Sequence, residues 1–348
     1  MTIPKTTRQY QLSKVGSYDN LEVREAPVSP PKAYEALVKV HAVSLNYRDL
    51  LVTKGTYMSS ALDQVIPCSD MAGEVIAIGE GVKDWKIGDR VCANFSLDHI
   101  HGNTTPEIKA TSLGATIHGV LTQYRTFPTH SLVRVPEHYS YEDASTLPCA
   151  ALTAYNALLG LVPLKAGDYV LALGLGGVST WGLQFALASG ATVIATSSSD
   201  EKLEVAAKLG AQHLINYKKT PNWDEEVLKI TNGVGVDHVI EVGGQGTLGR
   251  SMNSVRIGGC INIIGFVSQD AARNDANFIA NAIGKAAVMR GILIGSVAQF
   301  RDMNRLITAN PEKTKPIISK VFSFDQALDA FKYLDSGEHV GKVVIKVA

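Results

Sequence analysis

Glycines follow an apolar stretch near the middle of the chain, in a pattern suited to binding a phosphate group. The segment is Tyr169-Val-Leu-Ala-Leu-Gly174-Leu-Gly176-Gly177-Val178-Ser179. Glycines between a strand and a helix let a pyrophosphate approach the backbone closely, and the N–H groups that begin the helix favour its charge. The third fingerprint position holds Ser179, which is small enough for close packing of helix on strand. The pattern predicts a dinucleotide-binding turn, with a purely structural turn as the alternative.

Hydroxyl side chains follow about 20 residues later, where an NAD site has an acidic residue on the ribose. The matching position is Ser197, in the run Thr196-Ser-Ser-Ser-Asp-Glu-Lys202. A carboxylate there would repel a 2′-phosphate, whereas hydroxyls can donate hydrogen bonds to one. The residues expected to bind this phosphate are Ser197, Ser198, Lys202 and Tyr217. We therefore expect NADP(H) rather than NAD(H), although the same serines could simply cap the following helix.

The elements that must position these residues alternate regularly from about residue 150 onward. Candidate strands cover 169–173, 192–196, 213–216, 237–241, 260–264 and 291–295, with helical patterns between them at about 177–189, 200–209, 222–231, 246–255 and 274–286. Such alternation is the signature of a parallel sheet with helices on both faces. Six strands match the doubly wound Rossmann arrangement, so the fold class is predicted to be α/β.

The first third of the chain has a different pattern. Residues 34–44 alternate apolar and polar side chains as a half-buried strand does. Further strands are expected at 72–79, 90–95 and 131–135, and an irregular loop or lobe at 96–119. The tail returns to strand at 342–347 and could rejoin this β-rich region. A chain of 348 residues exceeds the usual limit of about 250–300 for one core, so two domains are expected.

Charge and composition exclude several classes of protein. Lysine plus arginine equal aspartate plus glutamate, at 33 each, which gives no electrostatic case for nucleic acid or an anionic membrane. The N-terminus is polar, and no run of about 18 apolar residues appears, so neither a signal peptide nor a membrane span is expected. A cytosolic location is the default expectation. The cysteines Cys68, Cys92, Cys149 and Cys260 are scattered and are expected to be buried free thiols.

Short motifs across nearly the whole chain resemble one family in their order and spacing. They are Ser44-Leu-Asn46-Tyr47-Arg48-Asp49-Leu50, Ile66-Pro67-Cys68-Ser69-Asp70, Gly88-Asp89-Arg90-Val91, Leu147-Pro-Cys149-Ala-Ala-Leu-Thr153, the glycine turn and Gly341-Lys342-Val-Val. The chain resembles the medium-chain dehydrogenase/reductase superfamily, particularly its quinone-oxidoreductase-like and zinc-independent alcohol-dehydrogenase-like branches. The resemblance implies a GroES-like catalytic domain at 1–150 and 293–348, a Rossmann domain at 151–292, and a cleft between them.

The same resemblance implies further contacts to the cofactor and a partner. Thr153 would pack near the nicotinamide, and Val178 would support the ring from behind. Additional cofactor-binding positions are the glycines of the turn with Gly243, Gly265 and Phe266. A homodimer is implied as well, formed by pairing of Rossmann sheet edges near 291–295.

The resemblance also allows the zinc question to be asked position by position. Zinc alcohol dehydrogenases bind the catalytic metal through a cysteine, a histidine and a second cysteine, often with a nearby glutamate. The matching residues are Asn46, Ser69, Cys149 and Asp70, in that order. Asparagine and serine are poor zinc ligands. Region 93–119, which matches the structural-zinc lobe, contains no cysteine, and His99, His101 and His118 are interpreted as loop histidines. No zinc is therefore expected.

Without a metal, hydrogen-bond donors must stabilise charge on the substrate oxygen. The candidates are Asn46, Tyr47 and Tyr57, the last at a position like that of the proton-donating tyrosine of enoyl-thioester reductases. Both tyrosines could instead be amphipathic residues that line a domain interface. Arg48 and Asp49 would orient this loop or serve a structural pair.

The expected activity is reduction of an activated C=C bond or a quinone by NADPH. Reduction of an isolated ketone or aldehyde, or oxidation of an alcohol, is the first alternative, since it needs the same cofactor and an oxygen-directed donor. A protein that binds NADPH without turnover is an alternative of another class. Binding of RNA through the Rossmann domain is disfavoured by the neutral charge balance. The substrate is expected to be a small molecule.

Overall fold

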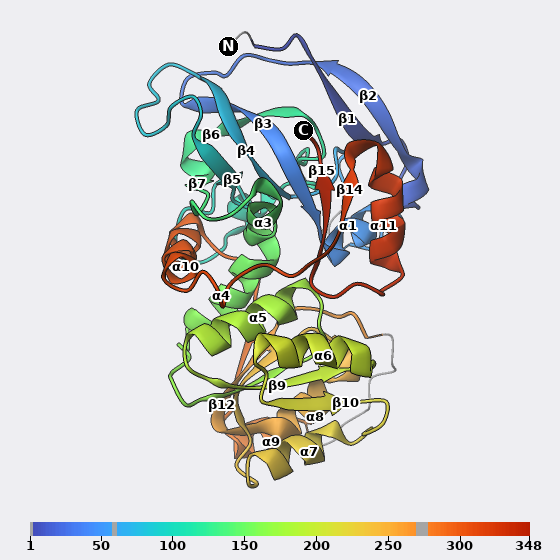
Figure 1. Ribbon diagram of the computed structural model, residues 1–348, viewed down its shortest axis with the longest axis vertical. Coiled ribbons are helices and arrows are strands. Elements are labelled where there is room, and N and C mark those ends of the chain that lie inside the picture. Colours follow the sequence, from blue (N-terminus) through green and yellow to red (C-terminus); the bar gives the residue numbers. More distant parts are fainter. Residues whose placement is uncertain (1–2, 58–60, 269–277) are drawn as a thin grey trace. The chain divides into compact units, whose positions relative to one another are not determined.

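A six-stranded parallel sheet forms the centre of the later part of the chain (Figure 1). Its strands are β8 (Tyr169–Ala172), β9 (Thr192–Ser197), β10 (His213–Asn216), β11 (Val236–Glu241), β12 (Val255–Ile263) and β13 (Val288–Gly291). They lie in the order β10-β9-β8-β11-β12-β13, and each neighbouring pair is parallel. This 3-2-1-4-5-6 order, which reverses direction between β8 and β11, defines the doubly wound dinucleotide-binding fold. The predicted fold class is confirmed.

Helices connect these strands. They are α5 (Gly177–Ala188), α6 (Asp200–Leu209), α7 (Trp223–Ile230), α8 (Leu248–Ser254) and α9 (Phe278–Gly284), and α4 (Leu152–Leu159) precedes the first strand. Local sequence explains their ends. For example, the side chain of Ser199 accepts a hydrogen bond from Lys202 N to begin α6, and Gly210 ends it in the left-handed conformation with φ of 106°.

The last strand of this sheet was predicted at the wrong position. We expected it at 291–295, whereas Val288–Gly291 pairs with the end of β12. The strand cannot continue through Ile294, because this residue has φ of 54°, outside the β region. The first residues of the helix expected at 274–286 lie outside the described residues.

The structure describes residues 3–57, 61–268 and 278–348. The chain folds into two compact units. The first unit comprises Met1–Leu152, Ile294–Ala309 and Pro316–Ala348, and the second Thr153–Leu293 and Asn310–Lys315. The segment Asn310–Lys315 was expected in the first unit. It packs with the second because the side-chain amide of Gln184 on α5 donates to the Lys315 carbonyl, and Lys313 Nζ donates to the Leu187 carbonyl at 3.4 Å.

The first unit is built on an antiparallel sheet in which the tail of the chain takes part. The strands are β3 (Glu35–Leu45), β4 (Asp70–Ile78), β5 (Arg90–Ala93), β7 (Leu132–Arg134), β14 (Ile318–Ser323) and β15 (Lys342–Lys346), in the order β14-β15-β3-β4-β5-β7, with β6 (Tyr124–Pro128) paired to β3. Only β14 and β15 run parallel to each other. Because β15 pairs with β3, the tail rejoins the β-rich region as expected. A separate ribbon pairs β1 (Thr6–Leu12) with β2 (Leu21–Pro27).

The helices of the first unit are mostly short. They are α1 (Tyr47–Lys54), α2 (Pro106–Ala110), α3 (Tyr141–Ser145), a π-helical turn at Leu147–Ala151, α10 (Val297–Ala309) and α11 (Ala327–Asp335). Helix α1 begins where Asp49 Oδ2 accepts the N–H of Asn46 at 2.8 Å, and it ends at Gly55, whose φ is 74°. No helix among the described residues is both long and apolar enough to cross a membrane.

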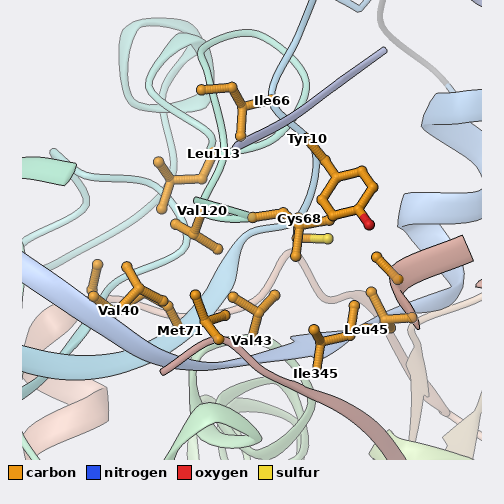
Figure 2. Close-up of a cluster of buried hydrophobic side chains, with 14 of the residues drawn as sticks. Tyr10, Val40, Val43, Leu45, Ile66, Cys68, Met71, Leu113, Val120 and Ile345 are labelled. Atoms are coloured by element: carbon orange, nitrogen blue, oxygen red, sulfur yellow. The ribbon is translucent and has the colours of Figure 1, made fainter. Parts of the chain in front are cut away.

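A hydrophobic core packs against β3 in the first unit (Figure 2). Figure 2 shows side chains of β3, β4 and β15 meeting those of the loops at 65–68 and 113–121. The buried residues of this core include Val40, Val43, Leu45, Met71 and Ile345. Cys68 belongs to this cluster, and all four cysteines are buried and unpaired, as the sequence predicted.

Candidate functional site

The glycine turn links β8 to α5 and leaves open space beside its backbone. Gly174 has φ of +69°, and its N–H donates to Thr196 Oγ1 at 3.3 Å. Gly176 is the N-cap of α5 and offers no side-chain cap. A Cβ atom added to either glycine would meet no atom of the described residues within 4 Å. Since Gly176 has an ordinary φ of −76°, no contact within the described chain requires glycine there. The turn has the room that a pyrophosphate on a helix N-terminus needs.

Residues around this turn have distinct surroundings. The hydroxyl of Ser179 donates to the Leu173 carbonyl at 2.7 Å and is buried, so serine at the third fingerprint position ties the helix to the strand. Val178 lies in the first turn of α5. Thr153 is buried, and its Oγ1 has no hydrogen-bond partner among the described residues. A buried hydroxyl without a partner is costly unless a ligand or water supplies one.

The residues predicted to bind the 2′-phosphate follow β9. Ser197 ends this strand, is only 3 % exposed, and accepts the Ser199 N–H at 3.3 Å. The N–H of Tyr217 donates to the Ser197 carbonyl at 3.0 Å, which brings that exposed tyrosine beside the serine run. Ser198 lies between Ser197 and the capping Ser199, and Lys202 is in the first turn of α6. The serines therefore do shape the helix start, as the alternative interpretation held.

The negative charge of Asp200, close to the serine run, is balanced by a lysine. The Lys219 ammonium and the Asn216 amide both donate to the Asp200 carboxylate, and these hydrogen bonds lower the pKa of Asp200. This ion pair offsets a negative charge next to the serine run.

A second loop system, beyond β11, is organised by a buried carboxylate that the sequence analysis missed. Glu241 accepts the N–H groups of Gly243 and Gly244 at 2.8 and 3.0 Å and the hydroxyls of Thr247 and Ser251. Its backbone carbonyl also accepts the N–H of Gly265 at 3.3 Å.

The same loops bring the remaining predicted cofactor residues together. A Cβ on Gly244, which has φ of +82°, would lie 2.8 Å from the Cα of Phe266. The loops after β11 and β12 therefore pack against each other, and the Phe266 side chain beyond them is half exposed.

In the first unit, Lys342 lies where the sequence analysis looked for metal ligands. Its Nζ donates to Oδ1 of Asn46 and to the Leu45 carbonyl, both at 2.6 Å, and the residue is only 3 % exposed. Strand β15 places Lys342 next to Asn46, because Val343, the residue after the lysine, pairs with Leu45, the residue before the asparagine. A buried ammonium with carbonyl-type oxygens around it is a fixed positive charge.

Asp70 completes this polar cluster. Its Oδ1 accepts the Ser69 hydroxyl at 2.6 Å, and its Oδ2 accepts the Cys149 N–H at 3.1 Å. Burial raises the pKa of Asp70, and the positive charge of Lys342 opposes that rise. Burial likewise raises the pKa of the Cys149 thiol. Among the described residues, no group of three His, Cys, Asp or Glu side chains is arranged to bind a metal ion.

One predicted donor, Tyr57, packs against Arg48. Its guanidinium lies between two rings, 4.9 Å from the centroid of Tyr57 and 4.6 Å from that of Phe95, while Nη1 donates to the Leu113 carbonyl at 2.8 Å. Asp49 Oδ1 is 4.0 Å away. Arg48 therefore orders this loop and fixes Tyr57. Tyr47, the first residue of α1, is 40 % exposed.

Lys342, Glu241 and Phe95 are the site residues that sequence reasoning missed. A signal existed for Lys342, which stands among apolar residues in the strand Lys342–Lys346, and for Glu241, which ends an apolar strand. Nothing in the sequence pattern distinguished Phe95 from other core aromatics. The expected loop histidine His99 is in fact buried, with Nε2 3.0 Å from the Gly102 carbonyl.

The doubly wound sheet and its glycine turn place the second unit in the class of Rossmann dinucleotide-binding domains. Residues 177–309 match the family model described as zinc-binding dehydrogenase, and residues 32–137 match the alcohol dehydrogenase GroES-like domain. The chain belongs to the medium-chain dehydrogenase/reductase superfamily. It is thus an oxidoreductase of small molecules, and a nicotinamide cofactor is typical of its family.

Individual relatives differ in what their names state. A zinc-type alcohol dehydrogenase-like protein of Schizosaccharomyces pombe is 47% identical over 339 residues, 96% of this chain and 97% of that protein. A quinone oxidoreductase of Homo sapiens is 27% identical over 263 residues, 75% and 74% of the two chains. A solved structure of an NAD-dependent alcohol dehydrogenase aligns with a TM-score of 0.88 at 29% identity, covering 98% of this chain and 100% of that one.

Proposed function

We propose that this protein is a zinc-independent, NADPH-dependent reductase that transfers hydride to a C=C bond conjugated to a carbonyl, or to a quinone. The observation that carries the proposal is the hydrogen bond from the buried Lys342 ammonium to Asn46. Asn46, at a position where the resemblance implies a zinc ligand, is thus hydrogen-bonded to a buried ammonium.

The donor set does not fit a catalytic zinc. Asn46 Oδ1 is already bonded to an ammonium, and both oxygens of Asp70 accept hydrogen bonds from within the chain. Zinc binds cysteine as a thiolate, and burial raises the pKa of the single cysteine at these positions, Cys149. Metal analysis of the purified protein should find no stoichiometric zinc, and one tightly bound zinc per chain would overturn this part of the proposal.

The acceptor class follows from what hydrogen bonds alone can do. When hydride adds to the far carbon of an enone, or to a quinone, negative charge is delocalised onto an oxygen that a proton donor can neutralise. An isolated ketone gains no such delocalisation and depends more on an electrophile. Tyr57 and Tyr47 are the candidate proton donors. Asn46 is the third candidate, as a hydrogen-bond donor: Lys342 donates to its Oδ1 and so orients the side chain, while the donor group is the amide Nδ2.

The residues of the second unit fit a nicotinamide dinucleotide, which would supply the hydride when bound. The open space at Gly174 and Gly176 would receive the pyrophosphate, and the unpartnered Thr153 hydroxyl would meet the nicotinamide end, with Val178, Gly243, Gly265 and Phe266. Ser197, Ser198, Lys202 and Tyr217 would bind the 2′-phosphate. These assignments rest on the residue types and on the open turn.

The preference for NADPH needs its own test, because a similar structure is named as NAD-dependent. Ser197→Asp would place a negative charge at the end of β9. The variant should bind NADPH more weakly relative to NADH, by roughly tenfold or more, as expected for loss of a charge-assisted hydrogen bond. An unchanged preference would rule out this phosphate pocket.

An acceptor panel tests the reaction itself. We expect NADPH oxidation with an enone or a quinone and little with an isolated ketone of similar size. Turnover of the isolated ketone alone would favour the second candidate, a zinc-free ketone reductase or alcohol dehydrogenase. The name of the 47% identical relative is alcohol dehydrogenase-like, although of the zinc type. NADPH binding without reduction of any acceptor would mean a binding protein.

We also propose a homodimer. β13 is an edge strand of the six-stranded sheet, and its Val288 and Met289 are exposed, as are Ile279 and Ile283 on α9. An edge strand with exposed apolar side chains is prone to pair with a second copy.

A further inference from the structure

A pocket of about 310 Å³ opens in the first unit, and it shares no residue with the glycine turn or the Lys342 cluster. We call it the β6 pocket, because Tyr124, Arg125 and Thr126 of β6 line it together with Gln9, His118 and Thr122. The volume is at the lower end of the range for small-molecule sites, roughly 300–1,000 Å³. Polar side chains of β6 line one part of the pocket, and the apolar residues Pro27, Val28, Leu37 and Ile66 line another.

Arg125 brings an uncompensated positive charge to this pocket. One of its terminal nitrogens, Nη1, donates to the Gly119 carbonyl, and the guanidinium lies over the ring of Phe127 at 5.3 Å. Nε is buried and has no partner within the described part of the chain. Among the described residues, no aspartate or glutamate lines the pocket. No carboxylate of the described residues forms an ion pair with Arg125.

Burial also affects the pKa of this guanidinium. It lowers the pKa of Arg125 to about 10, which still leaves the guanidinium protonated near neutral pH. A partly buried charge without a counter-ion among the described residues is costly, and an anion that enters the pocket would reduce that cost.

His118 supplies a second donor of defined orientation. Its Nδ1 accepts the N–H of Ile66 at 3.2 Å, so in the neutral ring the proton is on Nε2. Burial, together with the charge of Arg125, lowers the pKa of His118 and favours this neutral form. The Nε2–H is therefore a hydrogen-bond donor at the pocket.

Hydroxyl groups complete the lining. Thr122 Oγ1 lies 2.9 Å from Thr7 Oγ1, which in turn accepts the N–H of Tyr124 at 3.1 Å, so this wall is held in place by hydrogen bonds. The hydroxyl of Thr126 belongs to the lining as well.

We propose that the β6 pocket binds a small oxyanion, the carboxylate or phosphate group of a small molecule, through Arg125 and His118. A guanidinium suits either group, because its N–H donors match the geometry of two oxygens and the hydrogen bonds are charge-assisted. The site is independent of the proposed reaction, since none of its residues is assigned to the cofactor or the substrate.

Calorimetric titration of the full chain tests this proposal. The probes are inorganic phosphate and acetate, each titrated separately into a buffer free of both. We expect saturable binding of at least one probe, and Arg125→Gln should weaken it by about tenfold or more, the effect of losing a hydrogen bond to a charged group. Phosphate-only and acetate-only binding would each identify the oxyanion.

Matched variants keep the result interpretable. Arg24→Gln removes an exposed guanidinium on β2 that pairs with Glu22 at 2.8 Å, and it should leave the affinity unchanged. His118→Gln changes an exposed residue and retains an acceptor for Ile66 N–H, so it should fold and bind more weakly, which tests the site even if Arg125→Gln does not fold. An anion bound at the glycine turn would be insensitive to both changes. Absence of saturable binding of either probe, or affinity unchanged in the variants that fold, would overturn the proposal.

Discussion

Lys342 and Asn46 are 296 residues apart in the chain, and Nζ of Lys342 donates to Oδ1 of Asn46 over 2.6 Å. The contact joins the start of the last strand to the residue that precedes α1. It places a positive charge next to the buried carboxylate of Asp70, whose pKa that charge lowers against the effect of burial. The same lysine therefore holds the last strand against the residue before α1 and supplies the positive charge beside Asp70.

Replacing this lysine should destabilise the protein. Lys342→Met would leave the Leu45 carbonyl and Asn46 Oδ1 without their donor and Asp70 without a nearby cation. The free energy of unfolding should fall by about 2–4 kcal/mol, measured by urea denaturation. Lys346→Met is the matched control on the same strand: its side chain is 60% exposed and 3.6 Å from Glu142, so its loss should cost less than about 1 kcal/mol. Equal effects of the two changes would contradict the special role of Lys342.

Asp49 should make stability depend on pH. Burial raises its pKa from 3.8 to about 6, so over that interval the folded protein retains a proton that the unfolded chain has released. Stability from this group is therefore present at low pH and is lost as pH rises through about 6. Asp49→Asn keeps an acceptor for the Asn46 N–H but does not titrate.

The comparison of these two proteins isolates the effect. Relative to wild type, the Asn variant should gain up to about 3 kcal/mol between roughly pH 4 and pH 7. The measurement is urea denaturation of both proteins across this range. A constant difference at all pH values would show that the pKa of Asp49 is not raised.

Gly176→Ala should separate cofactor binding from folding. The backbone conformation there suits any residue, and the added Cβ would meet nothing within 4 Å of the described chain. The melting temperature should hardly change. A pyrophosphate at this turn would collide with the methyl group, so the dissociation constant for NADPH should rise by about tenfold or more. Gly284→Ala, whose added Cβ likewise meets no described residue within 4 Å, serves as the control and should bind normally. Undiminished binding by Gly176→Ala would move the pyrophosphate elsewhere.

Tyr57→Phe should reduce the rate of acceptor reduction without unfolding the loop. The phenyl ring can still pack on the Arg48 guanidinium, now 4.9 Å from the ring centroid, so stability should be kept. Loss of a proton donor should lower kcat by about 100-fold, measured by NADPH consumption with an enone. Tyr47→Phe, made in parallel, tests the second candidate and should have the smaller effect, because Tyr47 is 40% exposed whereas Tyr57 is held against Arg48. A reversed outcome would transfer the donor role to Tyr47, and wild-type rates in both variants would remove it from the two tyrosines.

Met289→Lys should dissociate the proposed dimer. Met289 is 42% exposed on the edge strand β13, and a lysine there opposes pairing with another copy. Light scattering after size-exclusion chromatography should give the mass of a monomer for this variant and of a dimer for wild type. Leu214→Lys provides a control, because Leu214 is 41% exposed on β10 at the opposite edge of the same sheet. If Leu214→Lys alone disrupted the dimer, the interface would lie at that other edge.

Local pattern was sufficient for much of the fold. The strands of the doubly wound sheet are short apolar runs and the turns between them contain glycine, so their order along the chain and the position of the dinucleotide turn could be predicted from sequence alone. β13 was misplaced because a run of apolar residues extends past the point where Ile294 adopts a positive φ. The ribbon of β1 and β2 was missed, since its strands contain many exposed polar residues and lack a clear apolar face.

The sequence by itself determined the fold class, the glycine turn and the serine run after β9. Each of these depends on residue types within a short segment. The tertiary structure alone decided that Lys342 meets Asn46, that Glu241 ties together the loops after β11 and that Arg125 and His118 share a pocket. Those relationships join segments that are distant or differently oriented, and a buried charge is recognised only when the groups that surround it are known.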